Sequence, residues 1–189
     1  MDTLEVKKTP LHKVWGNMEE MVKSGLTKSI GVSNCTIPLL LNILADCEIK
    51  PVTNQVECHP FFVQKNFVDF HNKFQVPITA YAPIGSGTWN LRGEHLKNVN
   101  VLTEPLVKDL AQKYGKSPAQ IVLNWHLHMK HIVIPKTAKV ERLSENFLCY
   151  DFTLTDEEYN QITKLDKEAR LFNPVHIQEI GWNNLPYFE

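Results

Sequence analysis

The chain lacks the features of a membrane-spanning or nucleic-acid-binding protein. No apolar run approaches the ~20 residues that a membrane-spanning helix requires. Basic residues form no cluster, and the formal net charge is −1. The first eight residues contain neither the apolar core of a signal peptide nor the arginine-rich pattern of a transit peptide. We therefore expect no membrane span and no nucleic-acid partner.

Cysteine is also scarce, and its spacing excludes the common metal and disulfide patterns. None of the four cysteines forms a CxxC pair; they are Cys35, Cys47, Cys58 and Cys149. His59 follows Cys58, but no second pair stands at zinc-finger spacing. His126 and His128 are two residues apart and would face different sides of a helix. We expect free thiols, a cytoplasmic location and no metal site.

What the chain does contain is an alternation of strands and helices. Its 189 residues are enough for one domain. Strands are predicted at residues 28–34, 52–57, 78–82 and 131–135. Helices are predicted near residues 11–24, 37–44, 67–74, 105–114, 118–127, 141–147 and 156–165. The first three strands recur about every 25 residues, which is typical of a parallel α/β sheet with both faces covered.

Polar residues stand at or just after the carboxyl end of each predicted strand. They are Ser33, Asn34, Gln55, Glu57, Tyr81, Lys136 and Thr137. Because function gathers at the carboxyl ends of parallel strands, these residues indicate a shared pocket. The alternative, ordinary polar turns at strand ends, stays open for any one of them.

The segment after the last strand has the composition of a phosphate site. Lys136 and Thr137 precede a predicted helix on which Arg142, Glu145 and Asn146 share one face. Two cations and a hydroxyl near a helix start favour phosphate binding. The alternative is a solvated helix with a satisfied Arg142–Glu145 pair.

Together these segments resemble the successive motifs of the aldo-keto reductases, from about residue 9 to the end of the chain. In chain order they read GVSN (31–34), NQVECHP (54–60), AYAPIG (80–85) and IPKT (134–137), with RxxEN at 142–146. Three positions depart from the usual motif. Ala82 stands where serine is common, Ile84 where leucine is usual, and Thr137 where serine is usual.

The resemblance implies an NADP(H) site. Ser33, Asn34 and Gln55 would bind the nicotinamide carboxamide, and Tyr81 would stack on the nicotinamide ring. Ile84 and Ser86 would lie along the pyrophosphate. The remaining residues would bind the adenosine end: Lys136, Thr137 and Arg142 the 2′-phosphate, Glu145 and Asn146 the adenine. Neither Tyr81 nor His59 matches a catalytic position of the family, and His59-Pro60 is interpreted as a turn.

The resemblance covers only the last four βα units of the family's eight-stranded TIM barrel, plus a C-terminal tail from about residue 170. The chain is thus predicted to be a single incomplete barrel domain. The family's catalytic Asp, Tyr, Lys and His belong to the first four strands, so no catalytic residue is expected here. An open half-barrel exposes unpaired strand edges.

Three functions remain open at this stage. The chain is a fragment of an NADPH-dependent reductase of small carbonyl substrates, or it pairs with a separate chain that supplies the other half-barrel. The third possibility is that the chain is an inactive accessory subunit derived from a reductase. In this family the loops and the C-terminal tail determine the substrate, and the motifs named above do not identify it. Trp182, Tyr187 and Phe188 in the tail either line an apolar pocket or pack against the barrel.

Overall fold

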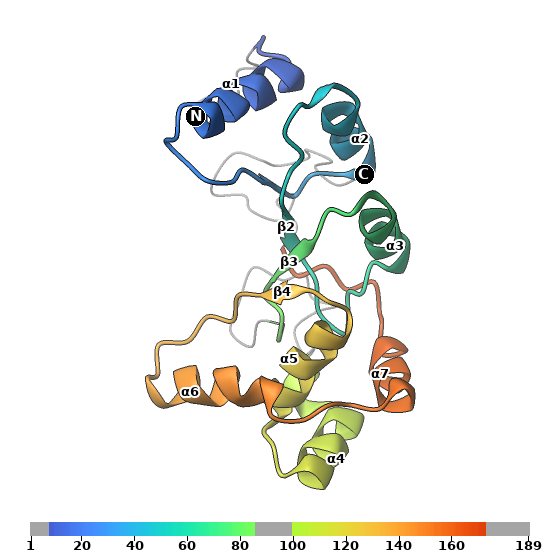
Figure 1. The fold of residues 1–189 in the computed structure, drawn as a ribbon. Helices are drawn as coiled ribbons and strands as arrows, with labels where there is room; N and C mark the ends of the chain where they lie inside the picture. The colour runs from blue at the N-terminus through green and yellow to red at the C-terminus, as the bar shows by residue number, and fades with distance from the viewer. Residues whose placement is uncertain (1–7, 86–99, 173–189) are drawn as a thin grey trace, which may run out of the picture. The chain divides into compact units, whose positions relative to one another are not determined.

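The computed structural model describes residues 8–85 and 100–172, drawn as a ribbon in Figure 1. In chain order the elements are α1 (Leu11–Lys23), β1 (Val32–Ser33), α2 (Ile37–Asp46), β2 (Asn54–Glu57), α3 (Lys65–Phe74), β3 (Ile78–Tyr81), η2 (Val101–Thr103), α4 (Pro105–Tyr114), α5 (Pro118–His128), β4 (Ile132–Val133), α6 (Glu141–Phe147), η3 (Leu148–Tyr150) and α7 (Asp156–Thr163). None of the helices in these ranges has the length and apolar character needed to cross a bilayer.

The strands form a parallel sheet in the order β1-β2-β3-β4. β1 pairs with β2, with Val32 opposite Asn54 and Ser33 opposite Gln55. β3 pairs with β4 through Thr79 and Ile132 and the residues that follow them. The predicted α/β class with a parallel sheet is confirmed. In this topology the connections between neighbouring strands are helical crossovers.

The two edge strands differ from the sequence prediction. β1 and β4 are two residues long, where strands were predicted at 28–34 and 131–135. Ile132 is 51% exposed and Ile134 44% exposed, so the expectation that both faces of the sheet are covered is wrong at β4. The physical reason is that an edge strand has one neighbour for hydrogen bonds, and the described residues supply no layer over these two side chains.

Local capping interactions set several of the helix ends. Ser117 and Gln120 form a reciprocal capping box at the start of α5, and Thr155 and Glu158 do so at the start of α7. Gly115 ends α4 with a φ of 61°, the left-handed conformation that glycine adopts without strain.

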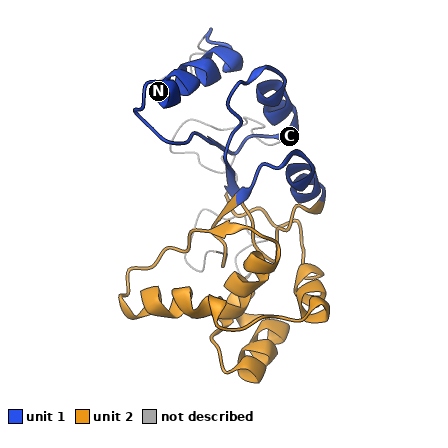
Figure 2. Cartoon of the chain, in the orientation of Figure 1, with its two compact units in different colours: residues 1–56, 66–78, 173–189 blue, residues 57–65, 79–172 orange. Residues whose placement is uncertain are grey.

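The chain divides into two compact units, shown in Figure 2, which are described separately below. Unit 1 comprises residues 1–56, 66–78 and 173–189; unit 2 comprises residues 57–65 and 79–172. In unit 1, α1 packs on α2 around a core built from Trp15, Leu40 and Ile43. The Trp15 indole donates a hydrogen bond to the Ile49 carbonyl oxygen at 3.0 Å.

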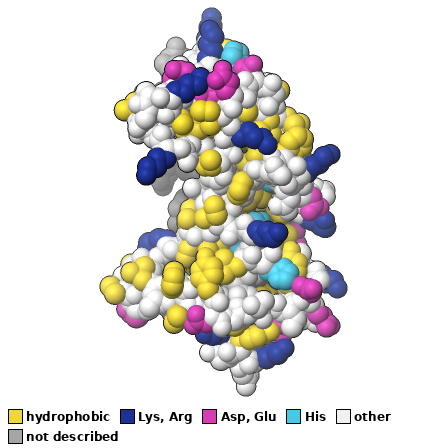
Figure 3. All heavy atoms as spheres, in the orientation of Figure 1, with side chains coloured by type: hydrophobic (Ala, Val, Ile, Leu, Met, Phe, Trp, Pro, Cys, Tyr) yellow, Lys and Arg dark blue, Asp and Glu magenta, His cyan; other side chains and the backbone are white. Residues whose placement is uncertain are grey.

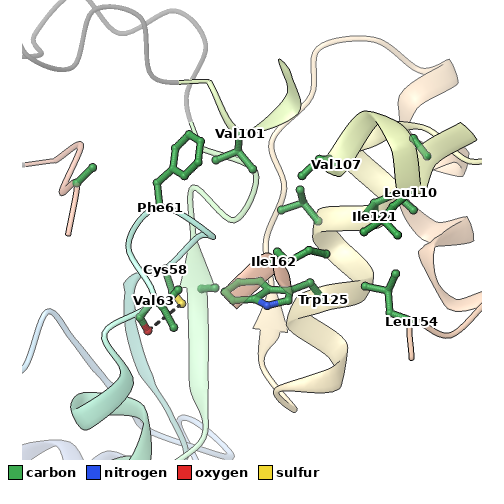
Figure 4. Packing of buried hydrophobic residues seen from close by; sticks show 14 of the residues in the cluster. Cys58, Phe61, Val63, Val101, Val107, Leu110, Ile121, Trp125, Leu154 and Ile162 are labelled. Carbon is green, nitrogen blue, oxygen red and sulfur yellow. Dashed lines mark hydrogen bonds between the residues drawn. The ribbon is translucent and has the colours of Figure 1, made fainter. Parts of the chain in front are cut away.

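Unit 2 is built around α5. This helix contacts α4, α6, α7 and β4. Its middle residues are buried, and Trp125 belongs to one hydrophobic cluster with Phe61, Ile121 and Ile162, which are labelled in Figure 4. On the face of the molecule drawn in Figure 3, acidic and basic side chains are interspersed with hydrophobic ones.

Candidate functional site

Unit 1 brings together the three residues predicted to bind a carboxamide. Ser33 ends β1 opposite Gln55, and the Ser33 hydroxyl donates to the Gln55 carbonyl oxygen at 2.9 Å. The Asn34 N–H donates to the same oxygen, also at 2.9 Å. Asn34 has a φ of 51°, a left-handed conformation that asparagine tolerates better than most residues. The chain therefore leaves the sheet sharply at this point.

The Asn34 side chain carries the least satisfied polar atom of this group. Its Oδ1 is buried, and it has no hydrogen-bond partner within the part of the chain that the structure describes. A buried acceptor without a donor costs about 1–3 kcal/mol. Natural proteins seldom keep such an atom unless a ligand, a water or an ion supplies the missing donor. Asn34 is therefore suited to accept a hydrogen bond from a ligand N–H group.

Asn54 positions this turn, a role that the sequence analysis missed. Its Nδ2 donates to the Cys35 carbonyl oxygen at 2.8 Å, and its Oδ1 accepts from the Cys35 N–H at 3.3 Å. The same Nδ2 lies 3.0 Å from Nε2 of His71. A polar amide inside a buried strand was the available signal. Burial raises the pKa of the Cys35 thiol to about 11, so the thiol beside Asn34 is neutral.

Tyr81 ends β3 in unit 2 and is half-buried. Its ring meets Phe172 edge-to-face, with the ring centroids 5.5 Å apart. Ala82, where the family usually has serine, adopts a φ of 48°, and the Gly85 N–H donates to the Ala82 carbonyl oxygen at 2.8 Å. This turn places Ile84 against the core of unit 2. Ser86 lies outside the described residues, as do Trp182, Tyr187 and Phe188.

The predicted phosphate-binding residues follow β4 in unit 2. Lys136 and Arg142 are exposed, and neither forms an ion pair with a described residue. The alternative of a satisfied Arg142–Glu145 pair is therefore not realised among the described contacts. Thr137 is half-buried; its hydroxyl accepts from the Lys139 N–H at 3.1 Å and donates to the Lys139 carbonyl oxygen at 3.3 Å.

Glu145 and Asn146 are half-buried on α6. The Gln120 side chain on α5 donates to the Glu145 carbonyl oxygen at 2.9 Å, which holds α6 against the centre of unit 2. Lys139 is a third exposed cation in this segment that the motif comparison did not single out. The segment carries three exposed cations and, at the start of α6, the exposed carboxylate of Glu141, and the cations are suited to bind an anion.

Glu57 does not belong to the pocket suggested by its place at a strand end. Its carboxylate is fully buried and accepts the backbone N–H groups of Leu171 and Phe172, at 2.6 and 2.9 Å. It also pairs with Nε2 of His59 at 2.9 Å. Glu57 thus fixes chain segments of unit 2. The Phe62 N–H donates to the His59 carbonyl oxygen at 2.7 Å, which confirms the predicted turn.

Comparison with known proteins places these features in one family. The family model "Aldo/keto reductase family" matches residues 5–167. The chain is 36% identical over 179 residues to a probable NAD(P)H-dependent D-xylose reductase of Aspergillus clavatus, covering 93% of this chain and 54% of that protein. It is 40% identical over 164 residues to an NADP-dependent D-sorbitol-6-phosphate dehydrogenase of Malus domestica, covering 87% of this chain and 52% of the relative.

The fold agrees with the sequence match. The structure of the aldose reductase from Schistosoma japonicum superposes with a TM-score of 0.82 at 34% identity, covering 97% of this chain and 56% of that one. The chain spans about half the length of the curated relatives it matches. Because the family model covers most of the sequence and a solved member shares its fold, the chain belongs to the aldo/keto reductase family.

Proposed function

We propose that this chain supplies the NADP(H)-binding part of an aldo-keto reductase that reduces an aldehyde or a ketone. The observation that carries the proposal is the buried Oδ1 of Asn34, which has no hydrogen-bond partner among the described residues. A nicotinamide carboxamide offers the N–H group that this oxygen lacks. The bound cofactor would supply a hydride to the substrate carbonyl carbon. All four cysteines are free thiols, which is compatible with a cytoplasmic location.

The residues of unit 1 fit the nicotinamide end. Ser33 and Asn34 donate hydrogen bonds to the backbone oxygen of Gln55 and not to its side chain. The side-chain amide of Gln55 would therefore be available to hydrogen-bond the ligand. The exposed Ser33 hydroxyl donates to that oxygen and keeps its lone pairs for a ligand N–H. The aromatic ring of Tyr81 would stack on the nicotinamide, a role that rests on its family motif.

The residues of unit 2 fit the adenosine end. Lys136 and Arg142 are cations without ion-pair partners among the described residues, so they are available to a 2′-phosphate. Thr137 would join them, Glu145 and Asn146 would hold the adenine, and Ile84 and Ser86 would lie along the pyrophosphate. The Malus domestica relative is named NADP-dependent.

The reaction also needs groups that this half of the family fold does not carry. Residues 1–189 would form a single incomplete TIM-barrel domain with the last four βα units and a tail. The exposed Ile132 and Ile134 support this view, because a completed barrel buries the faces of its strands. The acid that protonates the carbonyl oxygen would come from the other half-barrel, on the same polypeptide or on a partner. No residue named above is assigned a catalytic role.

A pair of variants in the complete natural protein tests the proposal. Lys136→Ala should weaken NADPH binding by about tenfold to a hundredfold, the worth of a hydrogen bond to a charged group, and leave NADH nearly unchanged. Asn34→Gly keeps the left-handed φ and should weaken NADPH and NADH equally. Lys108→Ala, which removes an exposed lysine on α4, is the control. Binding is measured by calorimetric titration.

The outcomes separate the possible functions. Equal loss of NADPH and NADH in Lys136→Ala would remove the 2′-phosphate role, and unchanged binding in both variants would reject the cofactor site. Reduction of a simple aldehyde by the unmodified complete protein would support the reductase. Cofactor binding without turnover would favour the alternative, an accessory subunit of a larger assembly that keeps the cofactor pocket.

A further inference from the structure

A cluster of three metal-ligating side chains lies in unit 2, among residues to which neither the family motifs nor the cofactor proposal gives a role. Cys58 follows β2, His126 lies on α5, and His131 precedes β4. All three are buried, and one ligand atom from each lies within 4.8 Å of the other two. Cys58 is 73 residues from His131, so only the fold brings them together. Figure 4 shows Cys58 facing Val63 beside the Trp125 ring.

The spacing of the ligand atoms is that of a coordination sphere. Nδ1 of His126 is 3.4 Å from Nδ1 of His131, and Sγ of Cys58 is 3.8 Å from the same nitrogen. Metal–nitrogen bonds of about 2.0–2.1 Å and a metal–sulfur bond of about 2.3 Å at a tetrahedral angle give N···N of about 3.3 Å and S···N of about 3.6 Å. These two distances are within about 0.2 Å of the expected values, and the third pair, Cys58 and His126, has its ligand atoms within 4.8 Å.

The orientation of His126 is also that of a metal ligand. Its Nε2 lies 2.9 Å from the Pro83 carbonyl oxygen. A carbonyl oxygen only accepts, so Nε2 carries the hydrogen and the lone pair of Nδ1 points to the cluster. Burial, followed by the neighbouring His131, lowers the pKa of His126 to about 3, so the ring is neutral. A backbone carbonyl that orients a histidine in this way is a common outer-shell feature of metal sites.

Without a cation the three side chains are joined by long hydrogen bonds, of 3.4 Å between the two histidines and 3.8 Å between Cys58 and His131. One proton on Nδ1 of His131 serves either His126 or Cys58 and not both. The other contact of the Cys58 thiol, to the Val63 carbonyl oxygen, is 3.9 Å long. Ordinary core packing accounts for the burial of these groups, but it does not require three potential ligand atoms to lie within 4.8 Å of one another.

We propose that Cys58, His126 and His131 form a binding site for one thiophilic closed-shell cation, Zn²⁺ or Cu⁺. Thiolate and imidazole are ligands that both ions favour. On binding, the Cys58 thiol releases its proton to solvent, and His131 keeps one proton by moving it from Nδ1 to Nε2. The balance is one proton released per ion, with no change in oxidation state. This proposal replaces the sequence-based expectation of no metal site.

The surroundings favour a cation over a bare thiolate. The carboxylates of Asp166 and Glu57 interact electrostatically with the Cys58 sulfur. Their negative charges offset the charge of a bound ion. Because the site is buried, the ion has a structural role, and it ties the end of β2 and the start of β4 to α5.

The test uses the complete natural protein, purified from its source without chelators. Elemental analysis should find about one equivalent of zinc or copper per chain, which also decides between the two ions. Replacement by Co²⁺ should produce a thiolate-to-cobalt absorption band. Cys58→Ala should abolish this band, and His131→Gln should weaken Co²⁺ binding by at least about a hundredfold. The control variants are Cys149→Ala and His128→Gln, which change a buried thiol and an α5 histidine outside the cluster. Both should leave the cobalt absorption band and the Co²⁺ affinity unchanged.

A metal content near zero together with the absence of a cobalt absorption band would overturn the proposal. Unchanged Co²⁺ binding in both cluster variants, or an equal loss of Co²⁺ binding in the control variants, would also overturn it. If the cluster variants do not fold, X-ray absorption at the metal edge of the unmodified protein decides. One sulfur and two nitrogen ligands support the site, and any sphere without sulfur refutes it. Lys136→Ala should leave the metal content unchanged, so failure of the cofactor proposal and failure of this one are distinguishable.

Discussion

The two ends of β2 carry buried polar side chains that satisfy their hydrogen bonds in different ways. Asn54, at the end that belongs to unit 1, is fully buried and pairs with both backbone groups of Cys35. Glu57, at the end that belongs to unit 2, is equally buried and accepts two backbone N–H groups, from Leu171 and Phe172. The amide both donates and accepts, whereas the carboxylate only accepts.

This difference predicts how much stability the protein loses when each side chain is replaced. A neutral amide that matches a donor and an acceptor needs no charge partner, so its loss costs the hydrogen bonds alone. A buried carboxylate needs donors on both oxygens, and removing its charge leaves His59 and two N–H groups facing a neutral group. We therefore expect the two ends of the same strand to respond unequally to substitution.

The largest effect is expected for Glu57→Gln. The new NH₂ group would face an N–H that now donates to the carboxylate, and the unfolding free energy should fall by about 3 kcal/mol. Denaturant unfolding of the complete protein measures the change. Glu157→Gln, an exposed carboxylate on α7, is the matched control and should stay within about 0.5 kcal/mol of the parent. A loss below about 1 kcal/mol would show that Glu57 does not fix the Leu171 segment.

A smaller loss is expected for Asn54→Ala. The N–H and carbonyl groups of Cys35 would lose their partner, and the unfolding free energy should fall by about 2 kcal/mol. The control is Asn72→Ala, an exposed asparagine on α3. An effect larger than that of Glu57→Gln would reverse the comparison between the two ends of β2.

The smallest effect concerns Glu158, a carboxylate at the margin of unit 2. Desolvation alone would raise its pKa, but hydrogen bonds from Lys113, Tyr114 and Thr155 outweigh it and lower the pKa from 4.5 to about 2. Because the folded-state pKa is depressed, the stability it contributes is present above about pH 4.5 and is lost as the pH falls toward 2.

Unfolding measured at about pH 6 and about pH 3 checks this expectation. The parent protein should lose about 1 kcal/mol more over that interval than Glu158→Gln, since the exposed Lys113 limits the gain through solvent screening. Equal losses in the two proteins would mean that Glu158 titrates normally in the folded state.

Much of the fold was predictable because its signals are local. Proline at the start of α4, the capping boxes at Ser117 and Thr155, and the left-handed Gly115 each act over a few residues. The short edge strands were not predictable in length, because a strand ends where its neighbour stops supplying hydrogen bonds. The exposure of Ile132 depends likewise on what lies over the sheet.

The candidate site likewise has some features that the local sequence predicts and others that depend on tertiary packing. Motif spacing predicted that Ser33 and Gln55 lie on neighbouring strands, and the structure places them opposite each other, although Gln55 is the second residue of β2 and not its end. It assigned Glu57 to a pocket because a strand-end position does not show which way a carboxylate turns. No pattern in the sequence could connect Glu57 to Leu171, since they are 114 residues apart.

The sequence by itself therefore determined the order of strands and helices and the family motifs from which the cofactor-binding residues are proposed, because each follows from neighbours along the chain. Only the tertiary structure decided which polar groups turn inward and which meet. The unpartnered oxygen of Asn34 and the convergence of Cys58, His126 and His131 arise from packing between segments far apart in sequence. The physical reason is that a buried donor or acceptor loses its hydrogen bonds to water, and only the packing of distant segments decides which protein group replaces them.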